Sequence, residues 1–236
     1  QTREISLDRL FVYLGVDTNG MLGLTLNVAA TIVIGFILFG QLLLRSGGAD
    51  FFNDVALSLM GKRKGGSGKI ATIASALFGS ISGVVVSNIV ATGVVTIRMM
   101  KKGGFKPHTA AAIETVASTG GQIMPPVMGA VAFLMAEFQI SYSDVVLAAL
   151  VPAILYYAAL YIQVDLEAAK EQIMPIDPAL IPSKRKVLKQ GWIFIVPFAA
   201  VILALFSFNQ RPETAALWGA LGALIVGVLK GYKGKR

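Results

Sequence analysis

Long apolar runs alternate with short, strongly charged segments along most of the chain. A helix needs about 20 mostly apolar residues to cross the hydrocarbon core of a bilayer. By this measure, the runs that suit a single crossing are residues 21–44, 144–163, 191–208 and 214–229. The pattern therefore predicts an all-α integral membrane protein.

Two shorter segments near the start of the chain have a mixed pattern. Residues 1–20 carry charges among apolar positions, so we expect a connecting or interfacial segment outside the hydrocarbon. Residues 49–60 are too short and too polar to cross a membrane. They predict an interfacial helix, or an extension packed on the first span. With that span they form a predicted unit from residue 21 to residue 60.

Residues 69–101 form an apolar run with basic residues at both ends and a Gly/Ser-rich break at residues 79–83. As one helix this run would be about 45 Å long, against about 30 Å of hydrocarbon. It would also separate its two basic ends across the membrane, against the excess of Lys and Arg in cytoplasmic loops. We therefore predict a re-entrant hairpin of two half-helices. Its tip is a candidate site, because non-helical backbone at membrane depth must be buried by protein or line a water-filled cavity.

Residues 108–138 are also too long for one straight crossing. In their middle, Gly120 and Gly121 precede Pro125 and Pro126. Paired glycines weaken a helix, and each proline removes a backbone donor. The pattern predicts a broken helix whose carbonyl oxygens are freed near the middle of the membrane.

Composition agrees with a membrane protein, with a mean hydropathy of +0.70 and only 14% charged residues. The net charge of +8 does not indicate binding to nucleic acid, because the basic residues gather in short loops between apolar runs. Such loops are typically cytoplasmic. We expect a cytoplasmic loop at residues 164–190, and a basic tail after the last two spans within residues 191–236.

Three tyrosines add to this topology. Tyr156, Tyr157 and Tyr161 lie toward the inner end of the span at residues 144–163, where they predict an aromatic belt.

The chain opens at Gln1 without an initiating Met, so we expect it to be a fragment of a longer polypeptide. The absence of Cys excludes a disulfide framework.

Three stretches carry a specific resemblance: ASALFGSISGVVVSNIVATG, AIETVASTGGQIMPPVMGAVAFLMAEF and LVPAILYYAALYIQVDLEA. They resemble the large membrane subunit of tripartite ATP-independent periplasmic (TRAP) transporters. The match is closest to the branch that fuses the small and large membrane subunits and works with TAXI-type binding proteins. The resemblance extends from about Leu10 to Arg236 and covers the first half of the large subunit. It implies half of an inverted-repeat elevator transporter, in which residues 69–138 move and residues 21–60 and the last two spans form a scaffold.

The resemblance also implies a function. We expect uptake of an organic acid by cation symport across the inner membrane of a bacterium or archaeon. A periplasmic TAXI-type binding protein would deliver the substrate, and a small membrane subunit would be fused upstream. The coupling ion would be sodium or a proton, with no other cofactor. In the family, sodium lies between hairpin-tip residues and carbonyl oxygens of the unwound helix. Carried onto this chain, these positions are Ser80, Ser82, Gly83, Gly120, Gly121, Met124 and Pro125.

The residues alone point to the same region less sharply. Unwound backbone and hydroxyl groups offer sodium hard oxygen ligands without a formal charge in the membrane. In the alternative interpretation, residues 79–83 only permit close helix packing, and Pro125 and Pro126 only kink a helix.

Glu114 lies in an apolar run a few residues before the unwound motif, where an ionisable group is costly and marks function by default. We hypothesise that it is a coupling or gating carboxylate. The resemblance sharpens this hypothesis, since dicarboxylate-type relatives place an acid near the position of Asn88 and a neutral residue near Glu114. A proton could then replace one sodium ion. In the alternative, Glu114 reaches the cytoplasmic boundary or pairs with Lys106 or His108.

Three neutral residues are further candidates for substrate or coupling contacts. Asn88 either lines the cavity or bonds a neighbouring helix, and Gln122 either bonds substrate or caps the broken helix. Thr119 completes the set.

Two other classes of protein use similar features. An ion channel could use the same hairpin as a selectivity filter. The long halves of the hairpin and the broken helix beside it suit instead a transporter that occludes one solute. We do not expect an enzyme, because one His, no Cys and no intramembrane pair of Asp offer no catalytic constellation.

Overall fold

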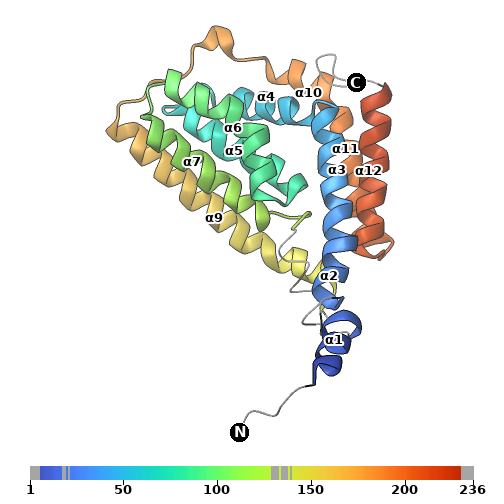
Figure 1. The fold of residues 1–236 in the computed structure, drawn as a ribbon. Helices are drawn as coiled ribbons and strands as arrows, with labels where there is room; N and C mark the ends of the chain where they lie inside the picture. Colours follow the sequence, from blue (N-terminus) through green and yellow to red (C-terminus); the bar gives the residue numbers. More distant parts are fainter. Residues whose placement is uncertain are drawn as a thin grey trace.

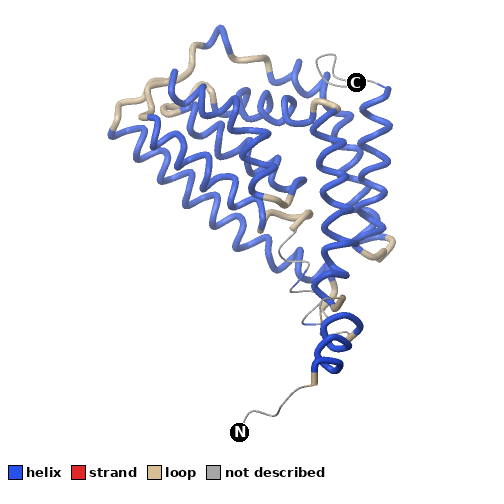
Figure 2. Tube along the Cα trace, viewed as in Figure 1, coloured by secondary structure: helices blue, strands red, loops and turns tan. Residues whose placement is uncertain are grey.

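Helices account for every regular element in the part of the chain that the structure describes (Figures 1 and 2). This computed structural model describes residues 6–17, 20, 22–128, 133, 138 and 140–229. Helical segments that are long and apolar enough to cross a membrane are Leu26–Arg45, Tyr142–Lys170, Pro178–Ser207 and Pro212–Leu229. They overlap the crossings predicted from the hydrophobic pattern, so the described part of the chain has the make-up of a multi-pass membrane protein.

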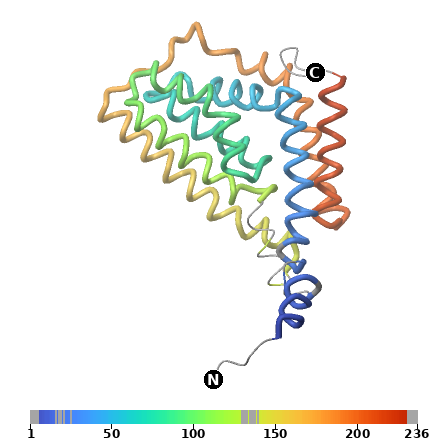
Figure 3. The backbone as a smooth tube through the Cα atoms, in the orientation of Figure 1, coloured from blue at the N-terminus to red at the C-terminus, as the bar shows by residue number. Residues whose placement is uncertain are grey.

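Three apolar helical rods stand side by side along one flank of the molecule, and we call them the column (Figure 1). They are α3 with its extension of α2 and the π-helical turn η1, α11 with the π-helical turn η5, and α12. The bounds are Leu24–Val28 for α2, Ala29–Val33 for η1, Ile34–Arg45 for α3, Ile195–Ile202 for α11, Leu203–Ser207 for η5 and Pro212–Leu229 for α12. Although α3 and α12 are distant in sequence, they pack against each other (Figure 3). Gly219 permits this approach, because the buried side chains of Phe39 and Val201 lie where its side chain would be.

Four further helices pack beside the column, and we call them the body. They are α5 (Gly66–Ser82), α6 (Val85–Lys102), α7 (Pro107–Thr119) and α9 (Tyr142–Lys170). The antiparallel pair of α5 and α6 packs against α7, and α9 borders α5 and α7 (Figure 1). Their shared core consists mainly of small and medium apolar side chains: Ala71, Met100, Phe105, Ala110, Ile113, Ala117, Leu160, Val164, Ala168 and Ile173.

Local sequence signals account for the starts of two body helices. Pro107 occupies the first turn of α7, where its missing N–H would have no helical partner. Ser141 caps α9 by accepting the Asp144 N–H.

Shorter helices join the column to the body at the upper end of Figure 1. They are α4 (Gly48–Met60) and α10 (Lys184–Gly191), which is followed by the short turn η4 (Trp192–Phe194). The rings of Phe51 and Phe194 stack with centroids 5.5 Å apart. The helix predicted at residues 49–60 is present as α4. It packs mainly on α5 and makes fewer contacts with the first span.

Two predicted boundaries are wrong. The break predicted at residues 79–83 lies too early, because α5 continues through Ser82 and the chain turns at Gly83, which has a left-handed φ of 56°. The cytoplasmic loop predicted at residues 164–190 also begins too early, since α9 continues to Lys170. Val164 and Ala168 are buried against the start of the hairpin, and this packing stabilises the extra turns.

The remaining short helices lie outside the column and the body. The 3₁₀ turn η3 (Pro178–Leu180) lies in the connection from α9 to α10, so part of the predicted loop is helical. At the other end of the molecule, α1 (Leu7–Val16) lies beyond α2 (Figure 1).

The two ends of the α5–α6 hairpin lie together. A Cβ atom on Gly103 would be only 2.7 Å from Ser67 Oγ. The exposed residues Lys64 and Lys102 therefore flank the same end of the hairpin. This is the geometry that a chain returning to its side of entry requires.

Candidate functional site

The helix that begins at Pro107 breaks after Thr119. A 3₁₀ turn, η2 (Gly120–Gln122), follows it, and the backbone from residue 123 to residue 128 is not helical. Pro125 and Pro126, joined by a cis peptide bond, supply no N–H groups to continue the helix. Of the predicted continuation to residue 138, residues 129–132 and 134–137 lie outside the described residues.

The break lies against the last turn of α5, and glycine makes this contact possible. A Cβ atom on Gly121 would be 2.8 Å from the Cα atom of Gly79. The Val127 N–H donates to the Ser80 carbonyl oxygen at 3.3 Å. Gly79 therefore serves close packing within a helix, and the hairpin and the broken helix meet at this point.

The residues predicted to bind a cation lie around this contact but do not form one cluster. Ser80 Oγ donates to the Leu77 carbonyl oxygen at 2.7 Å, and Ser82 Oγ lies 3.5 Å from the Val84 carbonyl oxygen. Both hydroxyl groups are therefore engaged inside the hairpin, and Gly83 is the turn residue that ends α5.

On the broken helix, the predicted residues face different neighbours. Gly121 contacts the hairpin, whereas Gly120 packs against the rings of Tyr156 and Tyr157 on α9. Met124 and Pro125 are half-buried in the non-helical segment. The structure thus brings Ser80 and Gly121 to the same contact and places Gly120 on the side of α9.

Glu114, on α7, is fully buried with an exposed fraction of 0%. Its Oε1 atom lies 2.5 Å from Thr92 Oγ1, and its Oε2 atom lies 2.5 Å from Thr96 Oγ1. Ser75 Oγ at 3.3 Å and Ser118 Oγ at 3.2 Å also approach Oε1. We call Glu114 and these four hydroxyl residues the hydroxyl cage.

The hydroxyl cage contains no cationic side chain. Elsewhere among the described residues, ion pairs join Lys69 to Asp165, Lys106 to Glu171 and Lys170 to Glu167. A buried carboxylate without a cation is expensive unless hydrogen bonds compensate it or a proton neutralises it. The pairing of Glu114 with Lys106 or His108, left open by the sequence, does not occur, since Lys106 pairs with Glu171 and His108 is exposed.

A count of protons shows what the cage can do. Each threonine hydroxyl has one proton and two lone pairs. Thr92 Oγ1 can also donate to the Asn88 carbonyl oxygen, and Thr96 Oγ1 to the Thr92 carbonyl oxygen, each at 2.9 Å. If both threonines donate to Glu114, they accommodate an ionised carboxylate. If one donates to the backbone, its oxygen can accept a hydrogen bond from the O–H of a neutral Glu114. Rotation of hydroxyl groups alone therefore lets the cage hold Glu114 in either protonation state.

Asn88 is buried beside the hydroxyl cage and connects the hairpin to the broken helix. Its Nδ2 atom donates to the Ser75 carbonyl oxygen at 3.0 Å and lies 3.5 Å from the Ser118 carbonyl oxygen. Its Oδ1 atom is 3.4 Å from Thr92 Oγ1, which also contacts Glu114. Asn88 and Glu114 therefore share a threonine, although they lie on different helices.

The sequence reasoning missed the hydroxyl residues of the cage. A local signal was available on α6, where Asn88, Thr92 and Thr96 recur every fourth residue in an apolar segment and so share one helix face. Glu114 and Ser118 have the same spacing on α7. That these stripes face each other depends on how the helices pack.

Two other candidates lie away from the cage. Thr119 is exposed, and its hydroxyl group donates to the Thr115 carbonyl oxygen of its own helix at 2.8 Å. Gln122 is half-buried in η2.

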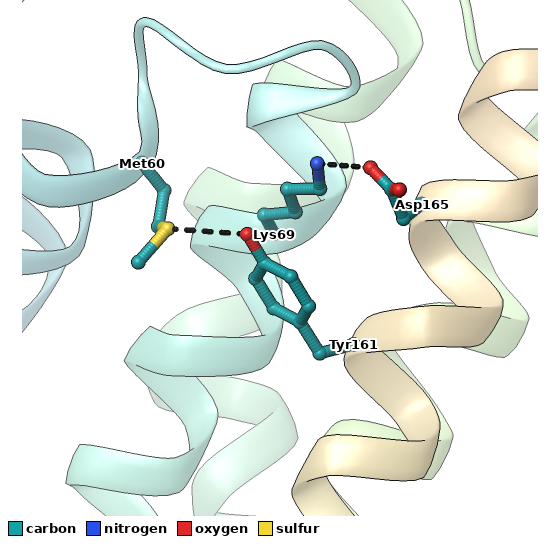
Figure 4. Close-up of polar contacts among 4 residues, drawn as sticks. All are labelled: Met60, Lys69, Tyr161 and Asp165. Carbon is teal, nitrogen blue, oxygen red and sulfur yellow. Dashed lines mark hydrogen bonds and ion pairs between the residues drawn. The ribbon is translucent and has the colours of Figure 1, made fainter.

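Each of the tyrosines predicted to form an aromatic belt contacts a specific group on a neighbouring helix. Tyr156 Oη donates to the Val116 carbonyl oxygen at 2.7 Å, and Tyr157 Oη donates to the Ala117 carbonyl oxygen at 2.9 Å. Tyr161 Oη lies 3.7 Å from Met60 Sδ (Figure 4). These contacts orient the side chains toward neighbouring helices, and the aromatic belt stays a prediction.

Polar contacts at the basic end also hold the body together. Lys69, one of the basic residues that flank the predicted hairpin, is buried and forms an ion pair with Asp165 of α9 (Figure 4). Its Nζ atom lies 5.2 Å from the centroid of the Tyr161 ring. Nearby, Lys106 Nζ donates to Glu171 Oε1 at 2.6 Å. This hydrogen bond raises the pKa of the Lys106 ammonium and lowers the pKa of the Glu171 carboxyl.

Sequence comparison places this geometry in a known family. The profile described as "Tripartite ATP-independent periplasmic transporter, DctM component" matches residues 6–236. The chain belongs to this family. The DctM family consists of transporter permeases and is not a family of enzymes.

Named members of the DctM family are similar to the chain at modest identity. The sialic acid TRAP transporter large permease SiaM of Vibrio cholerae is 25% identical over 209 residues, which are 89% of this chain and 49% of the relative. The C4-dicarboxylate TRAP transporter large permease DctM of Pseudomonas aeruginosa is 26% identical over 196 residues, which are 81% of this chain and 45% of the relative. The chain therefore spans about half the length of these relatives.

Proposed function

We propose that this chain is the N-terminal half of the large permease subunit of a secondary transporter that imports an organic acid together with a cation. Membership of the DctM family supports transport, and relatives named for sialic acid and for C4-dicarboxylates support an organic acid as substrate. In this proposal a periplasmic TAXI-type binding protein delivers the substrate. A small membrane subunit, fused upstream, completes the permease in the inner membrane of a bacterium or archaeon.

The hydroxyl cage is the observation that supports cation coupling. It contains a fully buried carboxyl group at the contact between hairpin and broken helix, surrounded by groups that fit both of its protonation states. A site that changes charge without a change of backbone can take up a proton on one side of the membrane and release it on the other. We assign this role to Glu114.

The placement of Asn88 supports the same assignment. The resemblance implies an acid near Asn88 and a neutral residue near Glu114 in dicarboxylate-type relatives, and in this structure both residues contact Thr92. An exchange of acid and amide between the two positions keeps one carboxyl group beside the same threonine. The coupling site would then stay in place while the acid moves from the hairpin to the broken helix.

A sodium site remains part of the proposal, at the contact of α5 with η2. Backbone carbonyl oxygens of an unwound helix suit sodium because they are hard ligands without formal charge. The Ser80 carbonyl oxygen already accepts the Val127 N–H, which supports the non-helical segment as the partner of the hairpin tip. Of the predicted residues, Ser80 and Gly121 are closest to this arrangement.

An elevator mechanism would move the body against the column. In support, helices of the body share a core of their own, and α9 is tied to the hairpin by the pair of Lys69 with Asp165. The short helices α4 and α10 connect the two groups in sequence. We propose that the body carries the substrate and the column stays fixed.

Uptake by the complete transporter in proteoliposomes tests the role of Glu114. With the binding protein present, we expect Glu114→Gln to abolish stimulation of uptake by an inward proton gradient. Glu167→Gln removes an acid of α9 that pairs with Lys170 at 3.7 Å, outside the cage, and serves as the matched control. Unchanged uptake and unchanged pH dependence in Glu114→Gln would end the proton hypothesis. Counterflow of labelled solute that depends on the binding protein distinguishes this transporter from the alternative of an ion channel.

A further inference from the structure

Three tyrosines of α9 form hydrogen bonds with the backbone of the broken helix, at the end of α7 and in the non-helical segment after it. Before the break, Tyr156 and Tyr157 donate to the carbonyl oxygens of Val116 and Ala117, at 2.7 and 2.9 Å. In the non-helical segment, Tyr142 Oη donates to the Pro126 carbonyl oxygen at 2.9 Å and accepts the Met128 N–H at 3.2 Å. One helix therefore contacts both the end of α7 and the non-helical segment that follows it through side-chain hydroxyl groups.

The length of α9 suits this arrangement. Carbonyl oxygens near the end of a helix have few partners within that helix, and at membrane depth water cannot replace them. The Val116 carbonyl oxygen accepts the Gly120 N–H as well as the Tyr156 hydroxyl group, so Tyr156 adds a second bond there. From Tyr142 to Tyr157, an α-helix rises about 22 Å. α9 is continuous over this distance, so it can support both the end of α7 and the non-helical segment that follows it.

The fit around η2 is close. A Cβ atom on Gly120 would lie 2.7 Å from Tyr156 Cδ1 and 2.9 Å from Tyr157 Cζ. The two rings contact each other edge to face, with centroids 5.5 Å apart. Tyr157 and Tyr142 are buried, with exposed fractions of 8% and 5%. These side chains are therefore fixed in position by the protein around them.

The supported backbone leads directly into the candidate site. Ser118, which follows the carbonyl oxygens bound by Tyr156 and Tyr157, belongs to the hydroxyl cage through Oγ and lies near Asn88 through its carbonyl oxygen. Within the non-helical segment, Val127 lies between residues bonded to Tyr142 and itself donates to Ser80. The tyrosine hydroxyl groups thus determine where Ser118 and Val127 lie relative to the hairpin.

We infer that α9 holds the backbone of the broken helix in place through its tyrosine hydroxyl groups. Tyr142, Tyr156 and Tyr157 are then positioning residues for the coupling site. The functional part of this inference rests on the proposed function. The tyrosines do not bind the cation themselves. They hold the unwound segment in the geometry that the site requires.

The test uses the complete transporter with Tyr156→Phe and Tyr157→Phe combined, which removes two hydroxyl groups and keeps both rings. Tyr161→Phe is the matched control, because Tyr161 lies on the same helix and its hydroxyl contacts Met60, away from the break. We expect the double variant to need about ten times more coupling cation for half-maximal uptake, since each lost hydrogen bond weakens the site severalfold. At saturating cation, uptake should approach that of the unchanged protein.

Hydrogen exchange measured by mass spectrometry provides a second readout that does not depend on transport. Peptides that cover residues 116–128 should exchange faster in the double variant than in Tyr161→Phe. Tyr142→Phe should speed exchange mainly in peptides that cover residues 126–128. If the tyrosine variants match Tyr161→Phe in both measurements, the tyrosines do not support the broken helix. This conclusion holds even when Glu114→Gln abolishes coupling. If uptake does not depend on a cation at all, the proposed function fails. Hydrogen exchange alone then shows whether the tyrosines support the broken helix.

Discussion

Glu114 combines complete burial with neutral surroundings, and this combination determines its chemistry. A salt bridge would hold the carboxylate ionised, whereas an apolar pocket would keep it protonated. Hydroxyl groups favour neither state absolutely, because each can donate or accept. The four hydroxyl groups of the cage therefore suit a residue that must change protonation state during a transport cycle.

Exchange of the acid and the amide provides a direct test of this cage. We predict that the double variant Asn88→Asp with Glu114→Gln regains cation-dependent uptake that Glu114→Gln alone has lost, because one carboxyl group again contacts Thr92. Asn88→Asp alone should impair uptake or folding, since two carboxyl groups would share the cage and repel each other when ionised. Proteoliposome uptake at several proton and sodium concentrations measures both effects. Equal activity of the double variant and of Glu114→Gln would contradict the shared site.

The broken helix depends on its neighbours more than on its own sequence. The end of α7 and the non-helical segment are supported by the hairpin through Gly79 and Ser80 and by α9 through tyrosine hydroxyl groups. Glycine is needed where backbones meet without room for a side chain. The contact of α5 with η2 is the point at which a small change in one element displaces the other.

We predict that Gly121→Ala destabilises the protein by about 1–3 kcal/mol, because inserting a methyl group into a packed contact forces backbone shifts. The added Cβ atom would lie 2.8 Å from Gly79 Cα, which is backbone and cannot rotate away. Gly15→Ala is the control, since a Cβ atom at this position of α1 would meet no other atom within 4 Å. Thermal unfolding in detergent compares the two variants. A Gly121→Ala protein as stable as the control would show that the contact is looser than described.

The whole molecule consists of two helical groups with different internal structure. The column packs three long apolar rods, whereas the body combines a hairpin, a broken helix and the long helix α9. Both basic ends of the hairpin lie at one end of the body (Figure 1). Because loops rich in basic residues are typically cytoplasmic, we predict that this end faces the cytoplasm.

We predict that Lys64→Cys and Lys102→Cys in the complete transporter both react with a membrane-impermeant maleimide only from the cytoplasmic side. Both lysines are exposed in this structure. Arg211→Cys, which is exposed in the turn between α11 and α12, should react only from the opposite side. Labelling of the two lysine positions from opposite sides would falsify the hairpin topology.

How far the sequence alone could lead differs between the helices and the site. The lengths of the apolar runs indicated most helices, and the paired prolines indicated the break, because run length and backbone chemistry are local properties. The turn at the tip of the hairpin was predicted a few residues too early, since Gly79 and Ser80 are compatible with a turn and with close packing. Only the contact with Gly121 distinguishes these possibilities.

The sequence by itself determined that the chain is apolar, helical and interrupted where prolines and glycines demand it. It also singled out Glu114, because an acid in an apolar run is conspicuous without any structure. The tertiary structure alone decided that Glu114 is surrounded by hydroxyl groups, and that Tyr156 and Tyr157 bind the backbone of α7. The reason is physical: these contacts join residues on different helices, and their distances depend on how the helices pack, which no local pattern specifies.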